Sequence, residues 1–171
     1  MRFLGLDPGL TVTGWGVLDS VGNELRHVAD GVVRPRAQDS MGARLAQLHD
    51  GLARIIAQYA PDEAAVEETF VNRNAASALR LGQARGVVLL APALVGILVA
   101  EYPANTVKKS VVGAGHAAKR QVGMMVKTLL PGSACLTEDA ADALAVAICH
   151  AHHAQTRRAL RKIEFSIGGA P

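Results

Sequence analysis

Hydrophobic and polar positions along the first third of the chain predict three strands followed by a helix. Short apolar runs cover residues 2–7, 13–18 and 24–33, and turns rich in glycine and polar residues separate them. From Met41 to Tyr59 the apolar residues recur every three or four positions, which predicts an amphipathic helix. Because the connections between them are short, the three strands are expected to form a meander.

The rest of the chain alternates predicted helices with short strands. Apolar runs at 64–67 and 96–100 are expected to be strands, and the first of these ends in two carboxylates. Helices are predicted at 75–90 with Asn74 as its cap, at 106–112, at 119–130 and from Glu138 to about His153. This order predicts an α/β fold with a five-stranded mixed sheet flanked by helices.

Length and composition fit a single domain. The chain has 171 residues, of which 50% are hydrophobic and 19% charged, and this excludes a disordered protein. We expect one domain over residues 1–155 and a flexible tail over 156–171. Cys135 and Cys149 have no metal-type spacing and are interpreted as reduced thiols. The uncharged run 86–100 is too short to span a membrane, so we expect a cytoplasmic protein without membrane contact.

Charge is unevenly distributed along the chain. The formal net charge is +3, but the segment from Thr69 to Thr137 holds eight basic residues and one acid, Glu101, for a net charge of +7. The basic residues are Arg73, Arg80, Arg85, Lys108, Lys109, Lys119, Arg120 and Lys127. A phosphate-binding face beside a carboxylate site would have this pattern, and so would an ordinary solvated surface.

Four carboxylates are candidates for a metal-dependent site. Asp7 and Glu67 each end a predicted strand, and Asp139 and Asp142 lie three residues apart on one face of the last helix. Four such groups brought together repel one another unless cations neutralise them, and carboxylate oxygens suit Mg²⁺ or Mn²⁺. Two such ions can support phosphodiester hydrolysis.

Each of these residues also has a purely structural interpretation. Asp7 in Asp-Pro-Gly is a typical turn residue, Glu67 could be a solvated acid, and the two helix aspartates could favour the helix dipole. Phe70, in a polar and basic loop, could stack on an unpaired base or pack into the core. The sequence favours a solvated helix end, and not a metal cluster, for His150, His152 and His153.

Four stretches together resemble the RuvC family of bacterial Holliday-junction resolvases. They are GLDPGLTVTGWGVL, AVEETFVNRNAASALRLGQARG, VKKSVVGAGHAAKRQV and EDAADALAVAICH, and they occur in order between Arg2 and His153. The resemblance implies an RNase H-like fold, a homodimer, and Mg²⁺-dependent paired nicking of four-way junction DNA. It also implies the RuvA–RuvB branch-migration complex as a partner.

The resemblance assigns roles to individual positions. The four catalytic acids of the family match Asp7, Glu67, Asp139 and Asp142, its junction-contacting aromatic matches Phe70, and its two functional lysines match Lys108 and Lys119. Further candidate DNA contacts are Arg73, Arg80, Lys109 and Arg120. The helix after Asn74 corresponds to the dimer interface of the family.

Three other functions remain open at this point. An RNase H-like nuclease of the YqgF type would act on RNA, but the loop around Phe70 and the VKKSVVGAGHAAK segment argue against it. An actin-like sugar kinase or ATPase would need two such domains, and 171 residues supply one. A non-catalytic junction-binding protein is disfavoured because all four acidic positions are filled.

Overall fold

A computed structural model describes residues 1–68, 74–115, 117–133 and 137–167, with side chains described up to residue 160. The strands are β1 (Arg2–Asp7), β2 (Thr13–Val21), β3 (Glu24–Val33), β4 (Glu63–Glu68) and β5 (Leu98–Pro103). The helices are α1 (Met41–Tyr59), α2 (Ala75–Ala93), α3 (Ala104–Val112), α4 (Lys119–Leu129) and α5 (Glu138–Ile167). None of the described helices is long and apolar enough to cross a membrane.

The strands form one mixed sheet in the order β3-β2-β1-β4-β5. The first three strands pair antiparallel, which confirms the predicted meander, while β4 and β5 are parallel to β1. Parallel neighbours need a crossover connection, and α1 and α2 supply it here. The carboxyl ends of β1, β4 and β5 therefore meet at one edge of the sheet.

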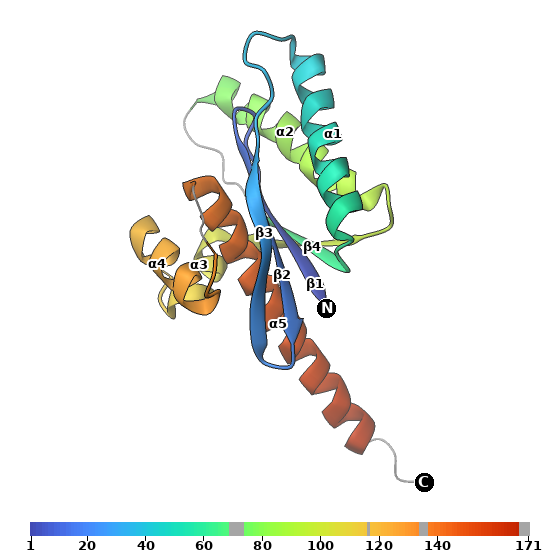
Figure 1. Cartoon of the computed structure of the whole chain (residues 1–171), viewed down its shortest axis with the longest axis vertical. Helices are drawn as coiled ribbons and strands as arrows, with labels where there is room; N and C mark the ends of the chain where they lie inside the picture. Colours follow the sequence, from blue (N-terminus) through green and yellow to red (C-terminus); the bar gives the residue numbers. More distant parts are fainter. Residues whose placement is uncertain (69–73, 116, 134–136, 168–171) are drawn as a thin grey trace.

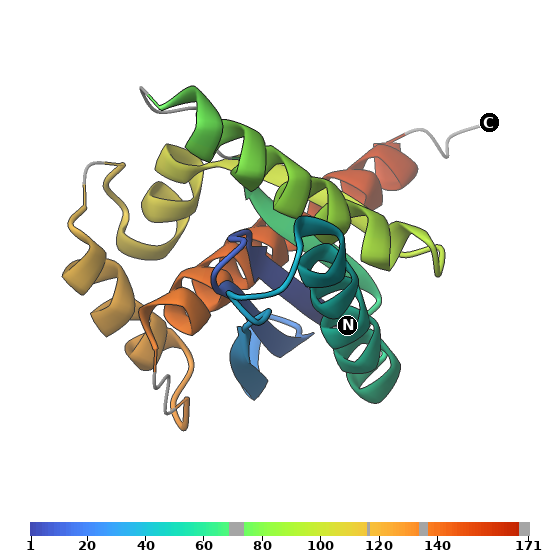
Figure 2. The ribbon, with the colours of Figure 1, turned by 90° about the horizontal axis from the view of Figure 1, so that it is seen from above.

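Helices cover both faces of the sheet (Figures 1 and 2). Successive strand residues point to opposite faces, so Leu4 and Leu6 pack with α1 and α2, whereas Phe3 and Ala65 pack with α3, α4 and α5. Two apolar clusters result, one on each face of the sheet. The long helix α5 lies across the second face.

Glycines in β1 and β2 let α5 approach the sheet closely. A Cβ atom on Gly14 would overlap the backbone carbonyl oxygen of Asp139, and one on Gly5 would overlap that of Ala143. Glycine is used where two backbones come this near. The Gly14-Trp15-Gly16 stretch of β2 therefore packs closely against the first part of α5.

Several predicted boundaries were wrong: β2 runs to Val21 instead of residue 18, α2 runs to Ala93 instead of residue 90, and the last helix and the last strand differ as well. The last helix, expected to end at about His153, continues to Ile167, because residues 154–167 contain no glycine or proline and several good helix formers. This part projects beyond the sheet (Figure 1), so it lacks the apolar pattern by which we recognised the rest. The last strand begins at Leu98 and not at Gly96, because Gly96 has φ of 78° in the turn before it.

Candidate active site

Asp7 and Glu67 lie side by side at the carboxyl ends of neighbouring parallel strands. The last paired residues of β1 and β4 are Leu6 and Val66, and each acid follows directly. The turn after Asp7 is closed by Thr13, which is buried and whose hydroxyl donates to the carbonyl of Gly9 over 2.6 Å. The side-chain hydrogen bonds of this turn join Thr13 to Gly9 and do not involve the Asp7 carboxylate, which weighs against a purely turn-forming role.

Asp139 and Asp142 reach the same end of the sheet from the first turns of α5. Thr137 begins this helix by accepting a hydrogen bond from the N–H of Ala140 through its hydroxyl, over 3.2 Å. The contact of Gly14 with Asp139 then seats this turn against β2, next to Asp7, which pairs with Gly14 in the ladder. Two strand ends and one helix start therefore place the four carboxylates in one neighbourhood.

Two of the four acids, Asp7 and Glu67, have pKa values that burial and the charges of acidic neighbours raise. Burial, together with the charges of Asp142, Glu67 and Asp139, raises the pKa of Asp7 from 3.8 to about 7. Burial and the charge of Asp142 also raise the pKa of Glu67. Clustered acids whose pKa values are raised in this way are typical of functional sites, where a bound cation or a proton offsets the repulsion.

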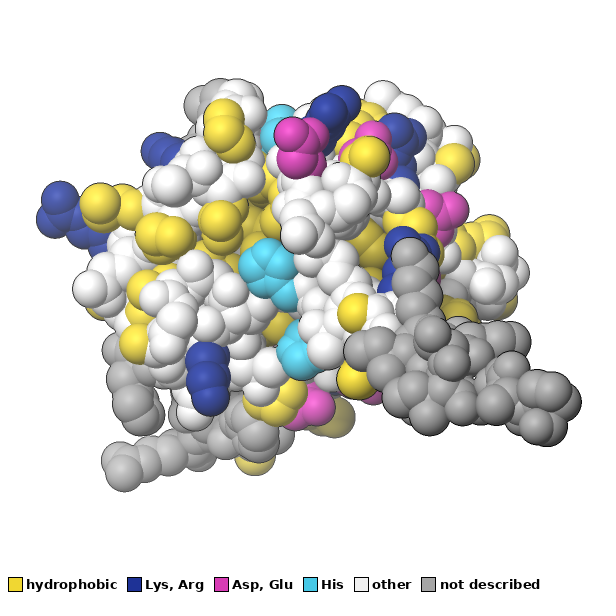
Figure 3. Space-filling model, turned by 90° about the horizontal axis from the view of Figure 1, so that it is seen from below, with side chains coloured by type: hydrophobic (Ala, Val, Ile, Leu, Met, Phe, Trp, Pro, Cys, Tyr) yellow, Lys and Arg dark blue, Asp and Glu magenta, His cyan; other side chains and the backbone are white. Residues whose placement is uncertain are grey.

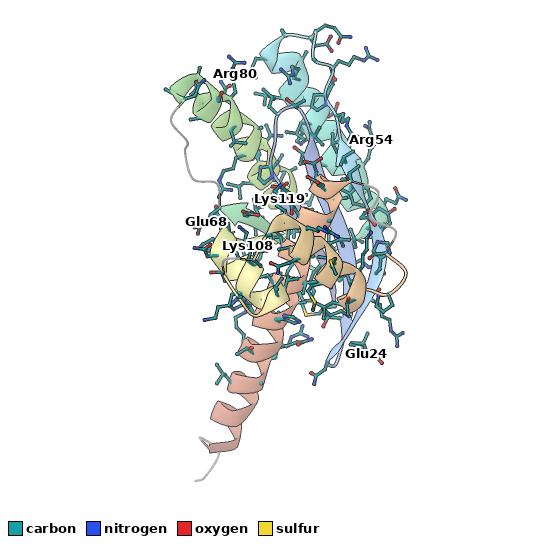
Figure 4. All side chains as sticks on the ribbon, turned by 90° about the vertical axis from the view of Figure 1, so that its left-hand side faces the viewer. Glu24, Arg54, Glu68, Arg80, Lys108 and Lys119 are labelled. Atoms are coloured by element: carbon teal, nitrogen blue, oxygen red, sulfur yellow. The ribbon has the colours of Figure 1, made fainter. Side chains whose placement is uncertain are left out.

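Lys119 and Lys108 are the cations of this neighbourhood. The Nζ of Lys119 donates to the carboxylate of Asp142 over 2.9 Å, which raises the pKa of Lys119. The charge of Lys108, on α3, lowers the pKa of Glu67. Figure 4 shows both lysines on the same side of the molecule, with Arg80 distant from them on α2. Two helices that follow the sheet in sequence therefore bring positive charge to its acidic edge.

The four carboxylates are suitable ligands for a divalent metal ion, although their side chains do not point at one common position. No three His, Cys, Asp or Glu side chains in the described ranges converge closely enough to hold an ion as they stand. Instead, one carboxylate oxygen of Asp142 accepts a hydrogen bond from Lys119. Four carboxylates at one strand edge are nevertheless the hard oxygen ligands that Mg²⁺ and Mn²⁺ take, and a cation among them would relieve the repulsion that raises the pKa of Asp7.

The other predicted DNA contacts lie at different distances from the four carboxylates. Arg120 lines a cavity of about 270 Å³ together with Asp142, so it lies beside the acidic residues. Lys109 lines a different cavity with Ser110 and His153, away from the carboxylates. Arg80 is exposed on α2. Phe70 and Arg73, and also Cys135, lie outside the described residues.

The interpretation as a solvated helix end was wrong for His150 but agrees with His153, which is exposed, while His152 is half-buried. His150 is 2% exposed, and its two ring nitrogens lie 2.8 Å from the Tyr102 hydroxyl and 2.9 Å from the Glu63 carboxylate. His152 is paired with Ser110 over 3.1 Å. The partners of His150 lie 48 and 87 residues away in sequence, so no local pattern indicates them. On the face seen from below, histidines reach the surface among apolar side chains, and the described lysines and arginines are scattered (Figure 3).

The raised pKa of Asp7 gives a first prediction. In metal-free protein, Asp7 is expected to titrate near pH 7, and Asp142→Asn is expected to lower this midpoint because Asp142 contributes the largest of the neighbouring charges that raise it. Carboxyl-carbon NMR over pH 4–9 measures both midpoints. Asp62, an exposed acid at the other end of the sheet, serves as the control for the same substitution. An Asp7 midpoint unchanged by Asp142→Asn would show that the two acids are not coupled.

Comparison with known proteins identifies the family. The model of the family "Crossover junction endodeoxyribonuclease RuvC" matches residues 3–150. The protein of that name from Paramagnetospirillum magneticum is 67% identical over 162 residues, which cover 95% of this chain and 98% of the relative. The one from Rhodospirillum rubrum is 66% identical over 153 residues, 90% of each chain.

Solved structures agree with this result. RuvC of T. thermophilus in complex with a Holliday junction substrate has a TM-score of 0.86 and 34% identity, over 92% of this chain and 96% of that one. The yeast mitochondrial Holliday junction resolvase Ydc2, at 13% identity and a TM-score of 0.66 over 91% and 80% of the two chains, shares the fold. The predicted RNase H-like fold with its five-stranded mixed sheet is thereby confirmed. Its sequence and its fold both place this chain in the RuvC family of crossover junction endodeoxyribonucleases.

Proposed function

We propose that this chain resolves Holliday junctions in homologous recombination and DNA repair. It does so by paired, metal-dependent nicks in strands of like polarity, which leave 5′-phosphate and 3′-hydroxyl ends. The observation that carries this proposal is the acidic edge of the sheet, formed by Asp7, Glu67, Asp139 and Asp142 and flanked by Lys108 and Lys119. The junction-bound structure of the T. thermophilus relative supports the same substrate.

Nucleases of this family are metal-dependent, and we propose Mg²⁺, with Mn²⁺ as a substitute, as the metal of this chain. The four carboxylates would hold two ions. When bound, such ions activate water for attack and stabilise the leaving oxygen of a phosphodiester. Lys119 donates to one of the two oxygens of Asp142, so the other oxygen is available to a metal ion, and the lysine ammonium lies next to the place that the scissile phosphate would take. Lys108, near Glu67, offsets charge that develops on the phosphate.

Positions around this edge are proposed to hold the DNA backbone. Arg120 lies beside Asp142, while Arg80 and Lys109 are exposed further out, where they would position the arms of a junction. Phe70, by family resemblance, and Arg73, as a basic residue close to it in the sequence, are further proposed contacts. Phe70 would stack on an unpaired base next to the cleaved strand.

A homodimer is proposed because two cuts need two sites. A twofold dimer places one acidic edge on each of two opposed strands. Helix α2 buries Ala84 and Val88, but it also exposes leucines along its length: Leu79 is 67% exposed, Leu90 is 50% exposed, and Leu94, the residue that caps its carboxyl end, is 63% exposed. Such a patch marks a protein–protein interface. We further propose RuvA–RuvB as the branch-migration partner, and the cytoplasm, where bacterial DNA lies, as the location.

The dimer proposal leads to a second prediction. Leu94→Asp introduces a charge into the exposed leucine patch and is expected to convert the protein to a monomer, because a buried unpaired charge is costly. Light scattering coupled to size exclusion measures the mass. Leu160→Asp, at a leucine that is 55% exposed on the projecting part of α5, is the matched control and is expected to stay dimeric. A dimeric mass for Leu94→Asp would exclude the Leu94 end of α2 from the interface.

The function itself is tested with a labelled mobile four-way DNA junction, incubated with Mg²⁺ or with EDTA. We expect symmetrically paired nicks only with Mg²⁺, and we expect DNA ligase to seal them. A protein that binds the junction but never cuts it would be a non-catalytic junction-binding protein. Cleavage of an RNA substrate without cleavage of the junction would identify an RNA-acting nuclease instead.

A further inference from the structure

Arg85 connects three elements at the acidic edge of the sheet. It lies on α2, and its side chain is only 18% exposed. One terminal nitrogen of its guanidinium donates to the backbone carbonyl of Glu67 over 2.8 Å, and the other pairs with the carboxylate of Glu101 on β5. Glu101 is the single acid in the basic segment from Thr69 to Thr137, and this ion pair gives it a role.

The hydrogen bond falls where β4 loses support from its neighbour. Glu68 is the last residue of β4, and opposite it on β5 stands Pro103, which has no N–H to give to the ladder. The carbonyl of Glu67 instead has a fixed, planar donor from α2. A guanidinium held at its other end by a carboxylate cannot swing away, so the backbone that carries the Glu67 side chain is held in place.

Arg85 acts on Glu67 through the backbone and not through its charge. The positive charges that lower the pKa of the Glu67 carboxyl are those of Lys108 and Lys119. The charge of Arg85 is paired with Glu101. Removal of Arg85 would therefore affect where the Glu67 carboxylate lies more than how readily it ionises.

We propose that Arg85 is a positioning residue, which fixes the end of β4 so that the Glu67 carboxylate stays aligned with Asp7 and Asp142 for metal binding. This inference rests on the proposed function, because it takes Glu67 as a metal ligand. Groups that orient metal ligands typically change metal affinity or activity by about 10–100-fold when they are removed. We expect an effect of that size here.

The test is Arg85→Met, which keeps the apolar stem of the side chain and removes both donors. At saturating junction DNA we expect kcat to fall by about 10–100-fold while KM stays within about threefold. Calorimetric titration of Mn²⁺ into the DNA-free protein should give an affinity about tenfold weaker. Arg85→Lys, which returns one donor, is expected to recover part of both losses. Arg54→Met, at an exposed arginine on α1 (Figure 4), is expected to match the wild type.

The two proposals fail differently in this experiment. If the wild type cuts junctions and Arg85→Met keeps both kcat and Mn²⁺ affinity within twofold, the positioning role is wrong and the nuclease function stands. A loss in KM alone would likewise overturn it, since it would make Arg85 a DNA contact. If Arg85→Met does not fold by circular dichroism, Arg85→Lys decides, and wild-type Mn²⁺ affinity in that variant overturns the proposal. A wild type that never cuts junctions contradicts the function instead.

Discussion

Asp7→Asn is expected to abolish junction cleavage while junction binding stays within about threefold of wild type. Asparagine keeps the shape of the side chain but loses the negative charge with which a carboxylate binds a divalent cation more strongly than a neutral amide does. Removal of a group that only hydrogen-bonds to a metal ligand typically lowers metal affinity or activity by about 10–100-fold. Loss of a ligand itself should therefore lower activity by more than about 100-fold. Gel-shift titration in EDTA measures binding, and gel analysis of a labelled junction with Mg²⁺ measures cleavage.

The same variant should be more stable than wild type without metal. The folded pKa of Asp7 is raised to about 7, whereas the unfolded chain ionises it near 3.8, so wild-type stability falls as pH rises between these values. Asp7→Asn removes this loss of stability. A pKa difference of about three units between the folded and unfolded states corresponds to a loss of up to about 4 kcal/mol. Its melting temperature in EDTA at pH 8 should exceed that of wild type, and the gap should shrink towards pH 4.

With metal present, wild type should become more stable than Asp7→Asn, because a cation stabilises only the protein that can bind it. Added Mg²⁺ is expected to raise the melting temperature of wild type and to leave that of Asp7→Asn nearly unchanged. A variant that is less stable than wild type in EDTA at pH 8 and that also loses junction binding would support the alternative that Asp7 is a structural turn residue.

Apolar runs bounded by turns, and apolar residues repeated every three to four positions, predicted most of the fold. The bounds of β1, β3 and α1 agree with the sequence prediction, because turns or a cap separate these segments from their neighbours. The neighbourhood of Asp7 and Glu67 also follows from sequence, since both end strands that the topology makes parallel neighbours. Their role as metal ligands stays a prediction.

Contacts between residues far apart in sequence could not be predicted. His150 resembles a residue of a solvated helix end, and only the packing of α5 on the sheet reveals its buried bonds to Tyr102 and Glu63. In the sequence Arg85 is one of eight basic residues, yet in the structure it donates to the backbone carbonyl of Glu67 and pairs with the carboxylate of Glu101. A lone acid in a basic segment was the available signal, and it indicates an ion pair without naming the partner.

Gly14→Ala is expected to lower cleavage activity far more than the addition of one methyl group usually does. The added Cβ overlaps the backbone carbonyl of Asp139, and backbone cannot rotate away as a flexible side chain can. The first turn of α5 must therefore move off the sheet and take Asp139 and Asp142 with it. A misplacement of about 1 Å can cost about 100-fold in rate, and overpacking typically costs about 1–3 kcal/mol of stability.

Gly42→Ala is the matched control, because a Cβ atom on that α1 glycine has no atom within 4 Å. It is expected to keep full activity and to gain up to about 1 kcal/mol, since alanine favours a helix over glycine. Junction cleavage and chemical denaturation of both variants, with Mn²⁺ titration of the DNA-free proteins, separate a moved site from a weakened fold. If Gly14→Ala is destabilised yet keeps wild-type cleavage and Mn²⁺ affinity, the start of α5 does not depend on this contact for its position. Loss of activity and Mn²⁺ affinity in a variant that is still folded would show that the glycine contact between β2 and α5 sets the geometry of the acidic edge.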